Sequence, residues 1–192
     1  MQASSIIFSI ILLLLTILFG WLNTKYNLLK DNSTAIKKPY SYARVQLAWW
    51  TIIILSSFIA IFITKGNLPI LDDSLIILLG ISSVTTATAA LIDASDQNKP
   101  ASTIIQNQES EGFFLDILSD ANGVSIHRLQ ALLFNIVIGI WMMYTVTVGL
   151  KSCVSIASVC INTIIPIIDT NKLLLLGVSA ATYAGLKTNE NK

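Results

Sequence analysis

The stretch LLGIS at Leu78–Ser82 recurs 97 residues later as LLGVS at Leu175–Ser179. The stretch LPILD at Leu68–Asp72 recurs at the same offset as IPIID at Ile165–Asp169. Because two separate stretches return in the same order and at one spacing, they indicate an internal duplication. Each copy therefore contains a Pro-containing connection followed by an apolar segment.

A third matching pair marks the start of each copy. SYARVQL at Ser41–Leu47 corresponds to SIHRLQA at Ser125–Ala131, at an offset of 84. The change from 84 to 97 means that the second copy carries 13 extra residues between its two apolar segments. Two segments per copy, which enter from one side of a membrane and return to it, predict two parallel helical hairpins related by an axis along the membrane normal.

The composition favours a membrane protein. The chain of 192 residues is 54% hydrophobic and only 12% charged, whereas soluble domains carry about 25% charged residues. A helix of about 20 apolar residues crosses a bilayer, and five stretches approach this length: Ile6–Leu22, Leu47–Thr64, Leu75–Ile92, Leu129–Leu150 and Leu173–Leu186. We therefore expect an all-α membrane protein with five transmembrane helices, namely an N-terminal anchor helix and two parallel helical-hairpin repeats.

Basic residues predict the orientation, because cytoplasmic loops are enriched in Lys and Arg. Nine of the 12 basic residues follow the first, third and fifth stretches, and the other three are Lys65, Lys151 and Lys172. We expect a bacterial inner-membrane protein with its N-terminus outside and its C-terminus in the cytoplasm. The predicted segments are an anchor (1–23), a basic cytoplasmic linker (24–40), the first repeat (41–93), a cytoplasmic loop (94–124) and the second repeat (125–192).

Charged residues at the cytoplasmic ends of the repeats are candidates for ion pairs. Arg44 and Arg128 open the first helix of each repeat, and Asp93 and its counterpart Glu190 follow the second. We hypothesise the pairs Arg44–Asp93 and Arg128–Glu190. The alternative is that each Arg side chain extends to lipid phosphates.

The second helix of each repeat is rich in small and hydroxyl-bearing residues, which are Gly80, Ser82, Ser83, Thr85, Thr86, Gly177, Ser179, Ala181, Thr182 and Gly185. Small residues allow close helix packing, within a subunit or in a homo-oligomer. Hydroxyl groups can instead line a hydrated pore. The sequence predicts no charged residue at mid-membrane height, which weighs against a proton-coupled transporter.

The only two cysteines, Cys153 and Cys160, lie in the extra residues of the second repeat. An oxidising periplasm would permit a disulfide between them, but two turns of one helix would hold them about 10 Å apart. A bridge therefore requires a bent, non-helical segment. The alternative is a pair of small apolar residues, and a short re-entrant loop is a third interpretation.

The loop before the second repeat predicts a short amphipathic helix. Phe113, Phe114, Ile117 and Leu118 have the spacing of one helix face. This face would lie on the inner leaflet or dock a cytoplasmic protein partner. The linker with Lys37 and Lys38 carries five basic groups and one acid over residues 23–46, which favours anionic lipid. The net charge of +1 makes nucleic acid an unlikely partner.

No catalytic or cofactor motif is present. The chain contains no P-loop, dinucleotide fingerprint or HExxH motif. Two cysteines and the lone His127 cannot supply the four ligands of a metal site. Trp49 and Trp50 are expected in the aromatic belt at one membrane face and Trp141 nearer the other. We therefore expect no enzyme, no cofactor and no metal.

The run LSDANGVSIHRLQ at 118–130, together with the LGIS and LGVS helices, resembles a group of small duplicated bacterial inner-membrane proteins. The resemblance covers about residues 37–187. Some multi-pass proteins of this kind are membrane subunits of antiphage defence systems such as Kiwa and Hailong. The resemblance implies an oligomer beside a cytoplasmic partner, although no partner-contact residue carries over.

These features predict an oligomeric membrane protein with a channel-like or membrane-perturbing effector role. The observations behind this prediction are the hydroxyl-bearing helix in both repeats and the lack of catalytic groups. The alternative is a non-conducting membrane anchor or sensor subunit that recruits a cytoplasmic partner. A small-solute transporter is a third interpretation.

Overall fold

The computed structural model describes residues 2–96, 108–120, 123–153 and 158–187 and is mostly helical. The long helices are α1 (Gln2–Tyr26), α2 (Tyr42–Lys65), α3 (Asp73–Asp96), α5 (Ile126–Ser152) and α7 (Thr170–Lys187). The short elements are α4 (Phe113–Leu118), α6 (Ser158–Asn162) and the antiparallel strands β1 (Ser119–Asp120) and β2 (Gly123–Val124).

Four helices in the described part of the chain are long and apolar enough to cross a membrane. These candidate spans are Ala3–Tyr26, Tyr42–Lys65, Asp73–Ser95 and Ile126–Ser152. The helix α7 has 18 residues but is not among them, because it is less apolar and begins with the polar sequence Thr170-Asn171-Lys172. Membrane-spanning helices are therefore present by length and composition, but the fifth predicted span is the weakest.

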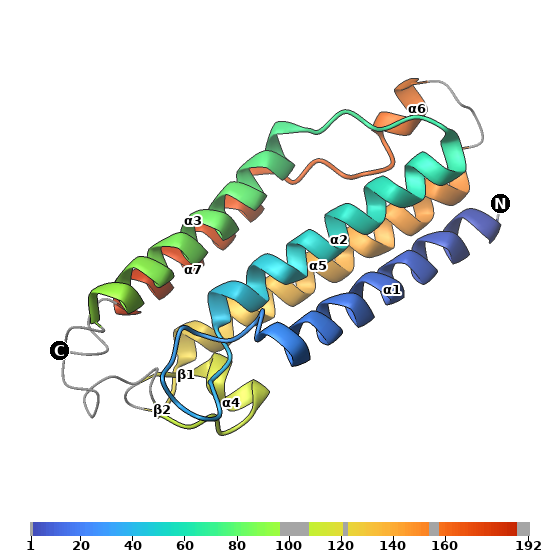
Figure 1. Cartoon of the computed structure of the whole chain (residues 1–192). Coiled ribbons are helices and arrows are strands. Elements are labelled where there is room, and N and C mark those ends of the chain that lie inside the picture. The colour runs from blue at the N-terminus through green and yellow to red at the C-terminus, as the bar shows by residue number, and fades with distance from the viewer. Residues whose placement is uncertain (1, 97–107, 121–122, 154–157, 188–192) are drawn as a thin grey trace.

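The five long helices form a bundle in which α1 lies outside a group of four (Figure 1). Within the group, α2 packs against α3 and α5, and α7 packs against α3 and α5. The helix α1 packs against α2 and α5. The helices α3 and α7 therefore lie side by side, in contact with each other as well as with the long helix that precedes each in the chain.

The bundle has two distinct ends (Figure 1). One carries α4, the two-stranded hairpin and the linker after α1, and we call it the α4 end. The other carries α6 and the turn that closes α2, and we call it the α6 end. At the α6 end, α2 stops at Gly66, whose φ of 74° is left-handed and whose N–H is bonded to the carbonyl of Phe62.

Two extended segments, 66–72 and 163–169, run back along the bundle before α3 and α7 begin (Figure 1). Each contains a proline, Pro69 or Pro166, which cannot donate a backbone hydrogen bond. Polar side chains hold them in place. Ile70 donates its N–H to Oδ1 of Asn162 at 3.0 Å, and Ile168 donates its N–H to Oγ of Ser74 at 3.1 Å.

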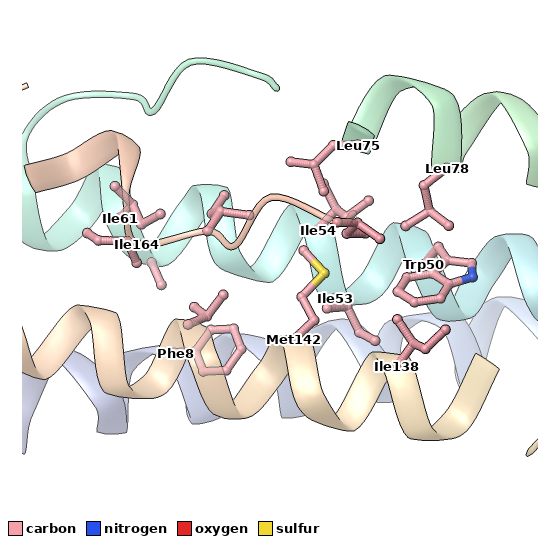
Figure 2. Packing of buried hydrophobic residues seen from close by; sticks show 14 of the residues in the cluster. Phe8, Trp50, Ile53, Ile54, Ile61, Leu75, Leu78, Ile138, Met142 and Ile164 are labelled. Carbon is pink, nitrogen blue, oxygen red and sulfur yellow. The ribbon is translucent and has the colours of Figure 1, made fainter. Parts of the chain in front are cut away.

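The apolar core lies between α1, α2, α5 and the starts of α3 and α7, and the segment before α7 also contributes to it (Figure 2). Phe8 of α1, Trp50 and Ile53 of α2 and Met142 of α5 meet there, and Trp50 and Met142 are fully buried. The expectation that Trp50 lies in a lipid-facing aromatic belt is therefore wrong. A second, smaller cluster at the α4 end contains Ile117 of α4 and Tyr183 of α7.

Candidate functional site

Three charged side chains meet inside the α4 end. Nζ of Lys187 lies 2.9 Å from Oδ1 of Asp93 and 3.7 Å from Oδ2 of Asp31. The side chains of Lys187 and Asp93 are only 4% and 3% exposed. Removing charges from water is costly unless they are paired, so this cluster (Asp31, Asp93 and Lys187) ties the ends of α3 and α7 to the linker after α1.

The hypothesised pair Arg44–Asp93 is not formed. Among the residues that the structure describes, Arg44 makes no ion pair, and Asp93 is bound by Lys187 instead. Arg44 acts on Asp93 only at longer range, through its charge. The physical reason is geometric, because α7 lies beside α3 and brings its last lysine to the carboxylate.

Arg128 is buried at the same end, and its guanidinium group lies over the ring of Tyr183 with 5.2 Å to the centroid. It also donates a hydrogen bond to the carbonyl of Ser119 in β1. Glu190, its hypothesised partner, lies outside the described residues. Arg128 therefore binds the hairpin and α7 together rather than extending to lipid.

An amide group inside α5 organises a second polar network. Asn135 accepts a hydrogen bond from Nε1 of Trp50 at 2.7 Å and donates one to the hydroxyl of Tyr42 at 3.2 Å. Its backbone carbonyl accepts a hydrogen bond from Nε1 of Trp49 at 3.1 Å. No sequence pattern described above pointed to Asn135. The signal was available, since an amide within an apolar helix requires a partner.

The amphipathic face predicted on α4 is divided between two environments. Ile117 is fully buried and Leu118 packs against the second cluster, whereas Phe113 is partly exposed and Phe114 is 68% exposed. Asp116 anchors the helix, because its carboxylate accepts hydrogen bonds from the N–H of Tyr40 at 3.1 Å and Oγ of Ser110 at 2.6 Å. The helix is thus fixed to the linker rather than lying free on a surface.

The predicted basic surface lies in that linker. Lys37 is exposed and Lys38 is half-buried, and the carbonyl of Lys37 accepts a hydrogen bond from the N–H of Ser110. A small cavity of about 90 Å³ lies beneath the linker and α4. Its polar walls include Lys187, Arg128 and Asp116.

The small and hydroxyl-bearing residues of α3 and α7 do not face one common path. Ser82 and Thr85 are buried; Thr86, Gly177, Ser179 and Thr182 are half-buried; Gly80, Ser83, Ala181 and Gly185 are exposed. Several hydroxyl groups are bonded to backbone carbonyls. Thr85 donates to Ile81, Thr86 donates to Ser82 and Ala43, and Ser179 donates to Leu175. These hydroxyl groups are therefore bonded to backbone carbonyls of their own helix or of the neighbouring helix.

Close helix packing occurs at glycines that the sequence pattern did not indicate. A Cβ at Gly139 would lie 2.5 Å from Nε1 of Trp49, and a Cβ at Gly149 would lie 3.0 Å from the backbone of Ile164. At Gly80 and Gly185 no atom of the residues that the structure describes would lie within 4 Å of an added Cβ. A Cβ at Gly177 would lie 3.6 Å from Cδ1 of Ile81, which is an ordinary contact, and Ser82 and Thr85 are buried. The stripe of small residues on α3 and α7 is therefore partly packed within the subunit and partly exposed.

Charged groups cluster where α3 and α7 begin. Lys172 forms an ion pair with Asp169, and its Nζ lies 4.8 Å from the ring centroid of Trp141, near the middle of α5. The sequence predicts no charge at this height.

Cys153 and Cys160 are joined by a disulfide, with a Cα–Cα distance of 5.8 Å. Helix α5 ends at Ser152, and Cys153 has an extended backbone conformation, so the two residues do not share one helix. Lys65 at the end of α2 donates a hydrogen bond to the carbonyl of Cys153. The bridge thus joins α6 to the end of α5, which contacts α2.

No family of proteins, curated protein or solved structure matches this chain. Within the described residues, no group of three His, Cys, Asp or Glu side chains could hold a metal ion.

Proposed function

We propose that this chain is a non-enzymatic, multi-pass membrane protein that acts through its α4 end, as an anchor or sensor subunit that recruits a cytoplasmic protein partner. The observation that carries the proposal is the organised structure of this end. A buried ion cluster and a fixed short helix hold exposed apolar side chains outside the candidate spans. Ile36 is 98% exposed and Phe114 is 68% exposed. Exposed apolar groups of this kind favour a protein contact.

The proposed topology has five transmembrane helices in two hairpin repeats that follow the anchor α1. In support, α2–α3 and α5–α7 each consist of a long helix, an extended Pro-containing segment and a second helix. The second helices pack against each other, as do the first. In this topology the α4 end faces the cytoplasm of a bacterium and the disulfide faces the oxidising periplasm.

Affinity purification from the native membrane tests the partner. We expect a cytoplasmic protein to copurify in fixed ratio with the wild-type chain and not with Phe114→Asp. The control is Val159→Asp, which places the same charge on an exposed side chain at the α6 end. Because Ile117 rather than Phe114 is buried, Phe114→Asp should still fold. The proposal fails if no cytoplasmic protein copurifies, or if Phe114→Asp retains it.

One observation favours the channel-like effector as a second candidate. The exposed ion pair of Lys172 and Asp169 lies beside Trp141, near the middle of α5. Charges at such a height in a membrane face water or a partner rather than lipid. A homo-oligomer that surrounds a hydrated vestibule would supply that environment. Such an effector role would also fit the resemblance to subunits of antiphage defence systems.

Ion flux through reconstituted liposomes tests the channel. We expect wild-type protein to release trapped ions and Lys172→Gln to change the rate. The control is Lys151→Gln, which removes an exposed lysine at the α6 end. If protein-containing liposomes release ions no faster than empty liposomes, the channel-like role is contradicted.

A further inference from the structure

A largely apolar pocket with a cation in its wall opens near the α4 end, between α1, α2 and α3. Its volume is about 340 Å³, and among the described residues that line it, Arg44 of the first turn of α2 carries the only charged side chain. The apolar wall includes Phe19 of α1, Leu29 after α1, and Leu47 and Ala48 of α2. The helices that form this wall are candidate membrane spans.

The polar groups of this pocket other than Arg44 are already bonded. Thr51 donates its hydroxyl to the carbonyl of Leu47, and Thr86 donates its hydroxyl to the carbonyls of Ser82 and Ala43. Arg44, in contrast, makes no hydrogen bond or ion pair with any described residue. It interacts with the charge of Asp93 only at long range, because Asp93 forms its ion pair with Lys187. A guanidinium group has five N–H donors that suit phosphate oxygens.

We propose that this pocket binds one anionic phospholipid, with an acyl chain against the apolar wall and the phosphate on Arg44. Charge favours an anionic headgroup. Residues 23–46 contain five basic residues and one acidic residue, a local balance of +4. The cation lies in the first turn of a span, which is where a lipid phosphate lies. The site adds a lipid ligand to the proposed role of the α4 end and does not depend on that role.

Lipid titration followed by native mass spectrometry tests the site on the full-length protein in detergent. The probes are phosphatidylglycerol and phosphatidylcholine with identical acyl chains. We expect the wild-type chain to retain one phosphatidylglycerol in preference to phosphatidylcholine. Arg44→Gln should lower the apparent affinity for phosphatidylglycerol by about tenfold, as expected for one charge-assisted contact. Lys37→Gln, which removes the same charge from an exposed side chain, should lower it by less than about twofold.

Two further variants separate the contact from a folding defect. Arg44→Lys keeps the charge and should retain part of the preference for phosphatidylglycerol. Ala48→Leu fills the pocket and should weaken binding of the acyl chain while Arg44 is kept. A bound ligand stabilises only the folded state that binds it, so phosphatidylglycerol should raise the melting temperature of the wild-type chain but not that of Arg44→Gln. Millimolar inorganic phosphate should leave the bound lipid in place.

Several outcomes would overturn the proposal. Equal binding of the two lipids would show that the headgroup charge does not contribute. Equal losses for Arg44→Gln and Lys37→Gln would show diffuse attraction without a site. Displacement of the lipid by inorganic phosphate would show that the acyl chain does not contribute. A change in oligomer mass for Arg44→Gln without a change in bound lipid would show that a second copy of the chain fills the pocket.

Discussion

Gly139 lies so close to the indole ring of Trp49 that no larger side chain fits between α5 and α2. A Cβ there would approach Nε1 of Trp49 to 2.5 Å. That same nitrogen donates a hydrogen bond to the carbonyl of Asn135 at 3.1 Å. The ring therefore cannot move away without losing its partner, and the glycine fixes how closely the two helices approach.

We predict that Gly139→Ala destabilises the protein. Overpacking of this kind costs about 1–3 kcal/mol, measured as a lower melting temperature in detergent. Gly80→Ala is the matched control, because nothing lies within 4 Å of an added Cβ there. Alanine in an open helical position should stabilise by about 0.5–1 kcal/mol. Equal effects of the two substitutions would contradict the assigned contact.

Lys187 is predicted to be the most sensitive charged residue at the α4 end. Lys187→Met leaves Asp93 and Asp31 without their cation, and breaking a buried pair costs about 3–5 kcal/mol. The double variant Lys187→Met with Asp93→Asn should recover part of this loss. A double-mutant cycle in detergent measures the coupling. The corresponding cycle of Arg44 with Asp93 should show weaker coupling. A coupling stronger than that of Lys187 with Asp93 would support the hypothesised pair Arg44–Asp93 instead.

Residue types were easier to predict from the sequence than residue partners. The sequence indicated that Asp93 pairs with a cation at the end of its helix, but it selected Arg44 because both belong to one repeat. The structure selects Lys187, because α7 packs beside α3. Likewise, Trp50 was expected in the aromatic belt at one membrane face, whereas its Nε1 donates a hydrogen bond to Asn135 of α5 inside the bundle. Contacts between helices depend on how the helices pack in three dimensions, which the spacing of residues along the sequence does not reveal.

At the scale of elements, a disulfide and a hydrogen bond fix the extra residues of the second repeat at the α6 end. The 13 extra residues of the second repeat include α6 and the disulfide between Cys153 and Cys160. Asn162 at the end of α6 accepts a hydrogen bond from Ile70, which lies between α2 and α3. The bridge therefore fixes a connection that contacts the first half of the chain.

Reduction of this disulfide should destabilise the protein. A bridge that closes a loop of this length contributes about 2–3 kcal/mol through the unfolded state. We expect a lower melting temperature for wild-type protein in reductant. The variant Cys153→Ser with Cys160→Ser should melt at that lower temperature with or without reductant. Reaction of both wild-type thiols with maleimide before reduction would contradict the bridge.

The positions of the long helices along the sequence were predictable, but their heights in the bundle were not. Apolar stretches such as Leu47–Thr64 and Leu75–Ile92 fall inside α2 and α3. Lys172, however, was expected beyond the membrane and lies beside Trp141 instead. An extended segment such as 163–169 covers a long distance with few residues, so it displaces the start of α7 along the bundle. Hydropathy records the length of an apolar run and carries no information about this shift.

At the scale of the whole molecule, the two ends of the bundle carry different chemical groups. The α4 end holds the buried ions, the fixed helix and the pocket of Arg44. The α6 end holds the disulfide and the exposed Val159. A protein that crosses a membrane presents these ends to different compartments. The proposed function therefore requires that α7 crosses the membrane and that the α4 end faces the cytoplasm.

Labelling of single cysteines with a membrane-impermeant maleimide tests this claim most directly. In the Cys153→Ser, Cys160→Ser background, Val159→Cys should react in intact spheroplasts. Ile36→Cys and Leu186→Cys should react only after the membrane is opened, because Lys187 lies beside Asp31 at the same end. Labelling of Leu186→Cys together with Val159→Cys in intact spheroplasts would show that α7 does not cross. Labelling of Ile36→Cys there would place the α4 end outside and contradict the account.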